Sequence, residues 1–159
     1  MIIKQLLDED FVNYKKPSMF IGFPHCSWKC EKDCGERGIC QNSALALSQD
    51  IFVEKQYLID RYLNNHITQA IVIGGLEPMD DYLQLYDFIS SFREVCEDDI
   101  VIYTGYRIEE ILEYICALQK YKNIIIKFGR YVPNSQPIYN TVLGVTLASD
   151  NQYALKLGD

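Results

Sequence analysis

Residues 26–40, CSWKCEKDCGERGIC, contain four of the six cysteines of the chain and follow a short apolar run at residues 19–23, MFIGF. Two glycines and the lack of an apolar period indicate a loop, in which closely spaced thiols can converge on one metal centre. Thiolates are soft ligands, so zinc and an iron–sulfur cluster are the candidates for this loop. We therefore predict that the apolar run is a strand that delivers a metal-binding loop.

The length and charge of the chain restrict the classes of protein to which it can belong. Its 159 residues suit one domain, so we expect a single domain over residues 1–159 with the cluster-binding loop at residues 24–45. A formal net charge of −7 argues against a nucleic-acid surface, which needs clustered Lys and Arg. No apolar run has the length of a membrane span and no cationic leader opens the sequence, so we expect a cytoplasmic protein with reduced thiols.

Short apolar runs alternate with segments of helical periodicity after the loop. The predicted strands are 70–73, 100–103 and 124–128, the predicted helices are 54–65, 82–92 and 108–118, and weaker strand signals lie at 142–147 and 153–157. Repeated βαβ units make a parallel sheet with right-handed crossovers. Roughly four to six strands are too few to close an eight-stranded barrel. The fold class predicted is thus α/β, an open partial (βα) barrel with a mostly parallel sheet.

The carboxyl ends of parallel strands meet at one rim, where ligand sites of α/β folds lie. The cysteine loop follows the first of these strands, and Gly74-Gly75, Thr104-Gly105 and residues 127–130 follow the next three. We expect these four segments, which are far apart in sequence, to form one site.

Several of these motifs resemble those of radical S-adenosylmethionine (SAM) enzymes. They are the C-x3-C spacing of Cys26 and Cys30 after a strand, Gly74-Gly75 with Glu77-Pro78, and the strand end at residues 103–106. More narrowly, they resemble the small activating proteins of anaerobic ribonucleoside-triphosphate reductases. The resemblance covers most of the chain and also includes residues 10–13, Gly129-Arg130 and residues 149–152.

The resemblance implies a [4Fe-4S] cluster in which three cysteines hold three irons and SAM binds the fourth through its amino and carboxylate groups. Cys26 and Cys30 would supply two of the ligands. The third is Cys40, which is followed by Gln41-Asn42 as in the family loop, or Cys34, whose spacing is closer to the family pattern. We prefer Cys40.

The resemblance also implies which residues contact SAM. The predicted cofactor-binding residues are Trp28, Gly74, Gly75, Glu77, Thr104, Lys127 and Arg130. Trp28 would pack on the adenine or cover the cluster, Glu77 would lie near the SAM amino group, and Lys127 and Arg130 would neutralise the carboxylate. No catalytic residue beyond the cluster ligands is expected, because hydrogen-atom abstraction by a 5′-deoxyadenosyl radical needs no general base or nucleophile.

The implied substrate is a glycine Cα–H on an anaerobic ribonucleotide reductase, with a flavodoxin or ferredoxin as electron donor. Two alternatives remain open. A radical SAM enzyme could act on another peptide or on a small molecule, and four thiolates could instead close a tetrahedral zinc site in a non-enzymatic interaction module. The remaining cysteines, Cys96 and Cys116, fall in predicted helices and are interpreted as small buried apolar residues.

Overall fold

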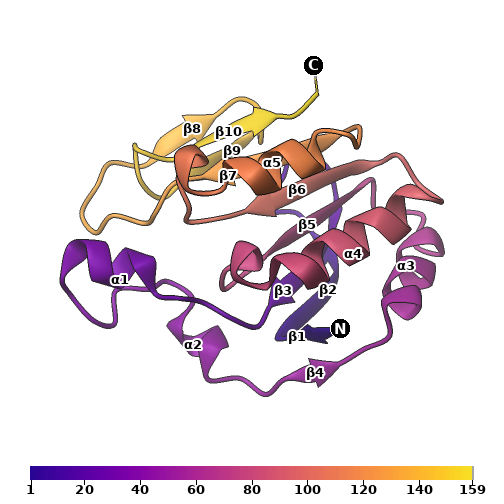
Figure 1. The fold of residues 1–159 in the computed structure, drawn as a ribbon, viewed down its shortest axis with the longest axis horizontal. Helices are drawn as coiled ribbons and strands as arrows, with labels where there is room; N and C mark the ends of the chain where they lie inside the picture. The colour runs from indigo at the N-terminus through magenta and orange to yellow at the C-terminus, as the bar shows by residue number, and fades with distance from the viewer. Residues whose placement is uncertain (159) are drawn as a thin grey trace.

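Residues 1–158, the part of the chain that the computed structural model describes, form a central six-stranded sheet in the order β10-β7-β6-β5-β3-β2 (Figure 1). Its strands are β2 (Gln5–Asp10), β3 (Ser18–Phe23), β5 (Ala70–Gly75), β6 (Asp99–Tyr103), β7 (Ile124–Phe128) and β10 (Tyr153–Lys156). Two short antiparallel pairs lie beside it, β1 (Ile2–Ile3) with β4 (Ile51–Phe52), and β8 (Ile138–Asn140) with β9 (Val145–Leu147).

The four inner strands are parallel, and the two edge strands are antiparallel to their neighbours. Phe23 lies opposite Gly75, and Tyr103 lies opposite Lys127, so β3, β5, β6 and β7 all end at one rim. The predicted α/β class and mostly parallel sheet are confirmed. Within the described residues β2 and β10 do not pair with each other, so the sheet is open.

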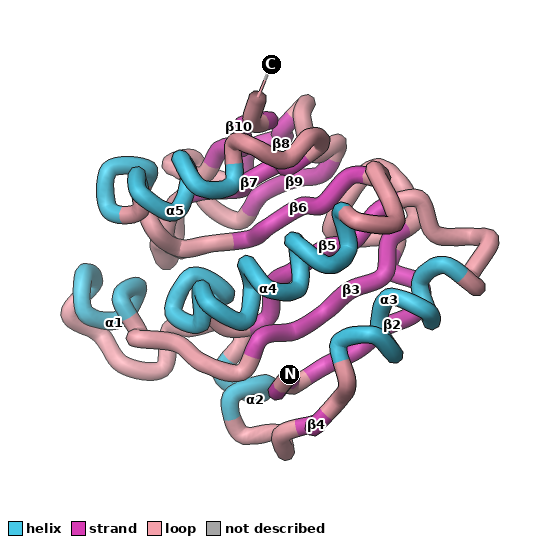
Figure 2. The backbone as a smooth tube through the Cα atoms, turned by 45° about the vertical axis from the view of Figure 1, so that its right-hand side comes forward, coloured by secondary structure: helices cyan, strands magenta, loops and turns pink. Residues whose placement is uncertain are grey.

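The three longer helices, α3 (Lys55–Leu63), α4 (Tyr82–Arg93) and α5 (Leu112–Leu118), cover one face of the sheet (Figures 1 and 2). This follows from the strand order, because neighbouring parallel strands are consecutive along the chain and right-handed crossovers then place every connecting helix on the same side. Shorter turns of helix are α1 (Lys29–Cys34), α2 (Ser43–Ala46), η1 (Pro78–Asp81) and η2 (Ile108–Glu110). No helix of residues 1–158 has both the length and the apolarity of a membrane span.

Alternate strand residues build two apolar layers, one on each face of the sheet. Ile71 and Ile73 point into the larger layer beneath the helices, where Leu85, Phe88 and Phe92 of α4 are fully buried. Side chains of this size stabilise the fold by roughly 1.5–3 kcal/mol each when they leave water. On the other face, the buried residues Val72, Val101 and Ile125 are covered by Leu143 and Leu147 of the C-terminal segment.

Local sequence predicted some boundaries wrongly. The segment 108–118 is not one helix, because η2 ends at Glu110 before α5 begins at Leu112. The segment 142–147 forms a strand only from Val145, since Gly144 lies in a turn with φ 73° and its amide bonds the carbonyl of Asn140. The cysteine segment, predicted as a loop, contains the short helices α1 and α2.

The prediction that Cys96 and Cys116 are buried helical residues is wrong. Cys96 lies beyond the end of α4 and is half-buried. Cys116 is in α5 but exposed, because the buried face of that helix is formed by Ile115 and Leu118. Apolar character alone does not place a cysteine on the inner side of a short amphipathic helix.

Candidate metal centre

The cysteine loop leaves the sheet at the end of β3 and passes along the rim (Figure 1). Cys26 precedes α1, Cys30 is in α1, and Cys40 lies between α1 and α2. The Nδ2 of Asn42 donates a 2.6 Å hydrogen bond to the carbonyl of Gly75, the last residue of β5. The far end of the loop is thereby tied to the strand next to the one that it left.

Three of the four loop thiols are half-buried at this rim. The Sγ of Cys26 accepts the backbone N–H of Trp28 at 3.2 Å, and the Sγ of Cys40 accepts that of Asn42 at 3.4 Å. Cys30 is also half-buried. Cys34, by contrast, is exposed at the last position of α1.

The half-buried thiols share one electrostatic environment. Burial raises the pKa of Cys26 to about 12, and it also raises that of Cys30. The negative charges of Glu77 and of Cys40 act on both groups in the same direction. A negative charge on one of these thiols disfavours ionisation of the others unless a cationic centre binds them, as a metal does.

The donors and the space around them fit an iron–sulfur cluster. Gly105 lies next to both Cys30 and Glu77, since a Cβ at residue 105 would be in ordinary contact with the Sγ of Cys30 at 3.5 Å and with Oε2 of Glu77 at 3.4 Å. Within residues 1–158, no group of three His, Cys, Asp or Glu side chains is gathered closely enough to hold one metal ion. Thiolates are the ligands that hold iron–sulfur clusters, so the donor type found at this rim fits such a cluster.

The paired glycines allow β5 to approach its neighbours closely at the rim. A Cβ on Gly74 would lie 3.2 Å from the ring of Phe20, and one on Gly75 would lie 2.7 Å from Cα of Gly22. Gly75 also has φ 85°, in the left-handed region that favours glycine. The structure therefore places both glycines where they were predicted, and packing already requires them.

Glu77 is buried and joins the ends of β5 and β6. Its Oε1 accepts the hydroxyl of Thr104 at 2.7 Å and the N–H of Met79 at 3.1 Å, and its Oε2 accepts the N–H of Gly105 at 2.8 Å. Burial raises the pKa of Glu77 to about 7, against the opposite effect of these three hydrogen bonds. The side chains predicted to meet SAM at positions 77 and 104 thus contact each other.

Lys127 is buried beside this pair. Its Nζ donates to the carbonyl of Gly129 at 2.9 Å. Burial lowers the pKa of Lys127 to about 8, and the charges of Glu77 and Cys30 act in the opposite direction. Lys127 is therefore a cationic group at the thiol end of the sheet.

Arg130 is engaged by carboxylates rather than open to a ligand. Its Nη1 and Nη2 donate to Glu110 at 2.8 and 2.7 Å, and its Nε lies 2.8 Å from Oδ2 of Asp33 without the angle of a hydrogen bond. Sequence reasoning missed both acidic partners, because each lies in a different segment and no local pattern connects them.

Asp80 is a further residue that the sequence did not reveal as part of the site. Its Oδ2 accepts the N–H of Ser27 at 2.5 Å, next to Cys26, and its Oδ1 accepts the hydroxyl of Tyr106. Its position three residues after Glu77, just before the predicted helix at 82–92, was the available signal.

Trp28 lies at the amino end of α1 with φ 57°, in the left-handed region. Together with Lys32 and Arg37, it lines an open pocket of about 330 Å³ on the outer side of α1. Glu31 and Glu36 also line this pocket, so its charged side chains are of both signs. Trp28 is part of the cysteine loop, and its packing on the adenine or over the cluster stays a prediction.

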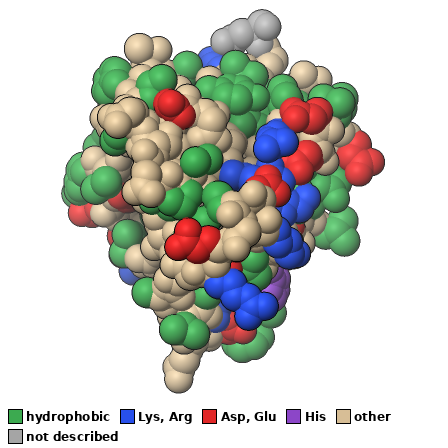
Figure 3. Space-filling view, turned by 90° about the vertical axis from the view of Figure 1, so that its left-hand side faces the viewer, with side chains coloured by type: hydrophobic (Ala, Val, Ile, Leu, Met, Phe, Trp, Pro, Cys, Tyr) green, Lys and Arg blue, Asp and Glu red, His purple; other side chains and the backbone are tan. Residues whose placement is uncertain are grey.

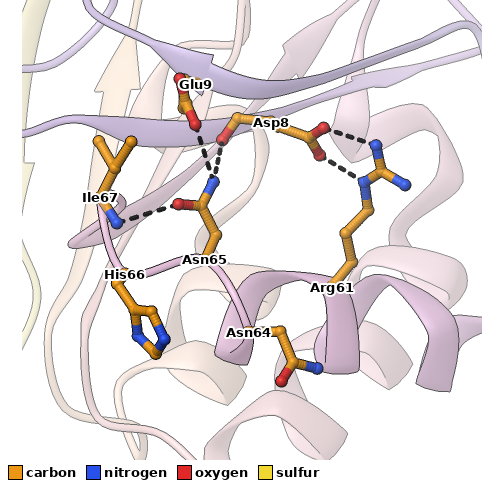
Figure 4. A pocket seen from close by; sticks show the side chains of 7 residues that line it. All are labelled: Asp8, Glu9, Arg61, Asn64, Asn65, His66 and Ile67. Atoms are coloured by element: carbon orange, nitrogen blue, oxygen red, sulfur yellow. Dashed lines mark hydrogen bonds and ion pairs between the residues drawn. The ribbon is translucent and has the colours of Figure 1, made fainter.

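A larger pocket, of about 440 Å³, lies at the opposite end of the sheet (Figure 4). Asp8 forms a two-pronged ion pair with Arg61 there, and Asn65 and His66 border it. Asp8 is near the end of β2, and the end of this antiparallel strand lies beside the beginning of β3, where Asp10 pairs with Ser18. The thiols follow the other end of β3. This pocket is therefore remote from the thiols.

Comparison with known proteins gave one match. The family model described as "4Fe-4S single cluster domain" matches residues 18–152, which include the whole cysteine loop and all four parallel strands. The searches of curated proteins and of solved structures gave no match. The match covers most of the chain, and it agrees with the thiols that the structure collects at the rim. The chain therefore belongs to the 4Fe-4S single cluster domain family.

Proposed function

We propose that this protein is a radical SAM enzyme with an open (βα) barrel, in which Cys26, Cys30 and Cys40 hold one [4Fe-4S] cluster. The observation that carries the proposal is that the three half-buried thiols lie at the end of the sheet where the parallel strands end. The bond from Asn42 to the carbonyl of Gly75 ties their loop to this end. A bound cluster would supply one electron to the sulfonium of SAM, giving methionine and a 5′-deoxyadenosyl radical.

The residues of the chain would bind and orient this chemistry. The half-buried thiols would enter the cluster as thiolates, and the buried cation of Lys127 would offset part of their negative charge. Trp28 would lie against the adenine, where a flat side chain already borders a pocket beside the loop. The buried Glu77 and Thr104 would keep the strand ends in place beneath SAM.

The substrate that we propose is a glycine Cα–H of an anaerobic ribonucleotide reductase, with a flavodoxin or ferredoxin as the electron donor. Two points support it. The motifs at residues 74–78 and 103–106 resemble those of reductase-activating proteins, and the sheet is open between its edge strands, which leaves room for a loop of a large partner.

Anaerobic reconstitution with iron and sulfide tests the cofactor. We expect a brown protein whose visible absorbance bleaches on reduction and which forms 5′-deoxyadenosine when SAM and a reductant are added. A colourless protein that binds zinc instead would contradict the proposal and favour the interaction module. With a competent reductase added, a glycyl radical detected by electron paramagnetic resonance would support the substrate. Its absence alongside 5′-deoxyadenosine formation would point to another peptide or small molecule.

Two cysteine variants test the choice of ligands. Cys40→Ser is expected to abolish formation of the four-iron cluster, because it removes one of the half-buried thiols at the rim. Cys34→Ser is the matched control, since it changes an exposed thiol of the same loop and should leave the iron and sulfide content unchanged. Loss of the cluster in the Cys34 variant, with retention in the Cys40 variant, would reverse the assignment.

A further inference from the structure

The short helix α1 carries Cys30, yet it buries none of its own residues. A helix of six residues is too short to be stable in water by itself, and it usually depends on an apolar face packed against the protein. Without such a face, the position of α1 depends on its polar contacts. The contacts that surround Cys30 therefore determine where its thiol lies when no cluster is bound.

Three side chains from separate segments form the central part of those contacts, and we name them the α1 latch: Asp33 of α1, Glu110 of η2 and Arg130 after β7. The Nη2 of Arg107 also lies near Asp33, at 3.6 Å from its Oδ2. The guanidinium of Arg130 is the centre of the latch. It bonds Glu110 in a fork and lies 2.8 Å from Asp33 on its third nitrogen. Glu110 is in turn fixed by the N–H of Arg107, whose bond to Oε2 is 2.8 Å long.

Two features make the latch more than a surface ion pair. The side chain of Arg130 is only 7 % exposed, whereas surface pairs contribute little because water screens them. A second ion pair connects Glu110 to α1, because Nζ of Lys29 lies 3.6 Å from the carboxylate of Glu110. The same Nζ lies 4.1 Å from the ring centre of Tyr106. On this side of the molecule, basic and acidic side chains lie among one another (Figure 3).

The geometry of α1 connects the latch to the thiol. Cys30 and Asp33 are three residues apart, so they lie on the same face of the helix. Fixing the carboxylate of Asp33 therefore fixes the direction of Cys30. Because its three guanidinium nitrogens already face carboxylates, Arg130 is poorly placed to receive the carboxylate of SAM as well.

We propose that Arg130 is a positioning residue, which holds α1 through Asp33 and Glu110 so that Cys30 faces the cluster site before the cluster forms. This inference rests on the proposed cluster but not on the substrate. It replaces the role in SAM binding that the sequence suggested for Arg130. The same latch would also slow the escape of the cluster, because Cys30 would stay in place after one iron–thiolate bond opens.

The test measures two quantities in the reconstituted protein under anaerobic conditions, the rate at which a chelator removes iron and the affinity for SAM. Arg130→Gln, Glu110→Gln and Asp33→Asn should each speed iron release, by about tenfold for Arg130→Gln, and leave SAM affinity within about twofold. Arg130→Lys should release iron more slowly than Arg130→Gln but faster than the wild type, since a lysine keeps the positive charge but cannot form a bidentate pair with a carboxylate. The double variant Asp33→Asn/Arg130→Gln should be no worse than Arg130→Gln alone.

Lys122→Gln is the control, because it breaks an exposed ion pair with Glu97 away from the cysteine loop and should change neither quantity. Weaker SAM binding with unchanged iron release in the Arg130 variants alone would overturn the latch and restore the carboxylate role. Asp33→Asn changes a side chain that is 42 % exposed, so it tests the latch even if Arg130→Gln does not fold.

Hydrogen exchange in the iron-free protein separates this inference from the proposed function. The amides of residues 29–34 should exchange faster in Glu110→Gln and Asp33→Asn than in the wild type, whether or not the protein accepts a cluster. Unchanged exchange at these amides would refute the latch. A wild type that takes up no cluster but shows the exchange difference would refute the proposed function and leave the latch standing.

Discussion

The substitution Glu77→Gln is expected to remove most of the pH dependence of folding between pH 5 and pH 8. Burial raises the pKa of Glu77 from 4.5 to about 7. A group whose pKa is higher in the folded state stabilises it fully below the unfolded pKa, and this contribution is lost as the pH rises through the folded value. The difference between the two pKa values corresponds to about 3 kcal/mol.

The glutamine cannot reproduce the bonds of the carboxyl group. A protonated Glu77 can still accept from Thr104, Met79 and Gly105, because each of its oxygens has a free lone pair. The amide nitrogen of glutamine accepts nothing, so one buried N–H or O–H is left unpaired, at a cost of about 1–3 kcal/mol. The variant should therefore be clearly less stable than the wild type at pH 5, and the difference between their free energies of unfolding should disappear by pH 8.

Urea unfolding of the iron-free protein under reducing conditions, at several values between pH 5 and pH 8, measures both effects. Glu94→Gln, which changes an exposed carboxylate at the end of α4, is the control and should keep the wild-type slope. A gap between wild type and Glu77→Gln that stays constant with pH would show that the carboxyl group is not buried as the structure has it, and the reasoning would fail.

Two further substitutions test the rim and the latch by their effect on stability. Gly75→Ala should lower the stability of the fold by about 3 kcal/mol or more, since a Cβ would lie 2.7 Å from Cα of Gly22. Gly35→Ala, at a similar φ but with open space around it, should lower it by only about 1 kcal/mol. Equal shifts of the two variants in thermal unfolding would contradict the close approach of Gly75 to Gly22. The hydrogen bonds from Arg130 lower the pKa of Glu110 to about 2, so this pair stabilises the fold above pH 4.5 and the contribution is lost as the pH falls toward 2. After allowance for solvent screening we expect about 1 kcal/mol, which urea unfolding at pH 3 and pH 6 should find in the wild type but not in Glu110→Gln.

The parallel part of the sheet could be predicted because its signals are local. Residues 70–73 and 124–126 are continuous apolar runs, and both are buried on two faces, as such runs require. The edge strand β2 could not be predicted, because its sequence, QLLDED, has no strand-like alternation and its pairing with β3 comes from the tertiary fold. The helix α1 was missed for a similar reason, since it has no apolar face.

The site could be predicted only as far as topology determines it. Parallel strands that end together place Gly75 and Gly105 near the thiols, whatever the side chains between them do. The partners of buried polar groups could not be predicted in this way. Nothing in the local sequence shows that Arg130 meets Asp33, or that Glu77 bonds Thr104, because these contacts join segments that are adjacent only after folding.

Different interactions hold the rim and the sheet beneath it in place. Below the rim, apolar side chains fill the space, whereas at the rim Glu77, Thr104 and Lys127 are buried and bonded to backbone or to one another. Buried polar groups are costly unless they are paired, so this layer is ordered without a cofactor. The loop that carries the thiols has no such layer, and polar contacts such as the latch and the bond from Asn42 to Gly75 hold it to the rim. The cluster would therefore assemble against a rim that is already formed, in a loop that a few polar contacts hold in place, which is why substitutions in the latch should change the loading and loss of iron more than they change the stability of the sheet.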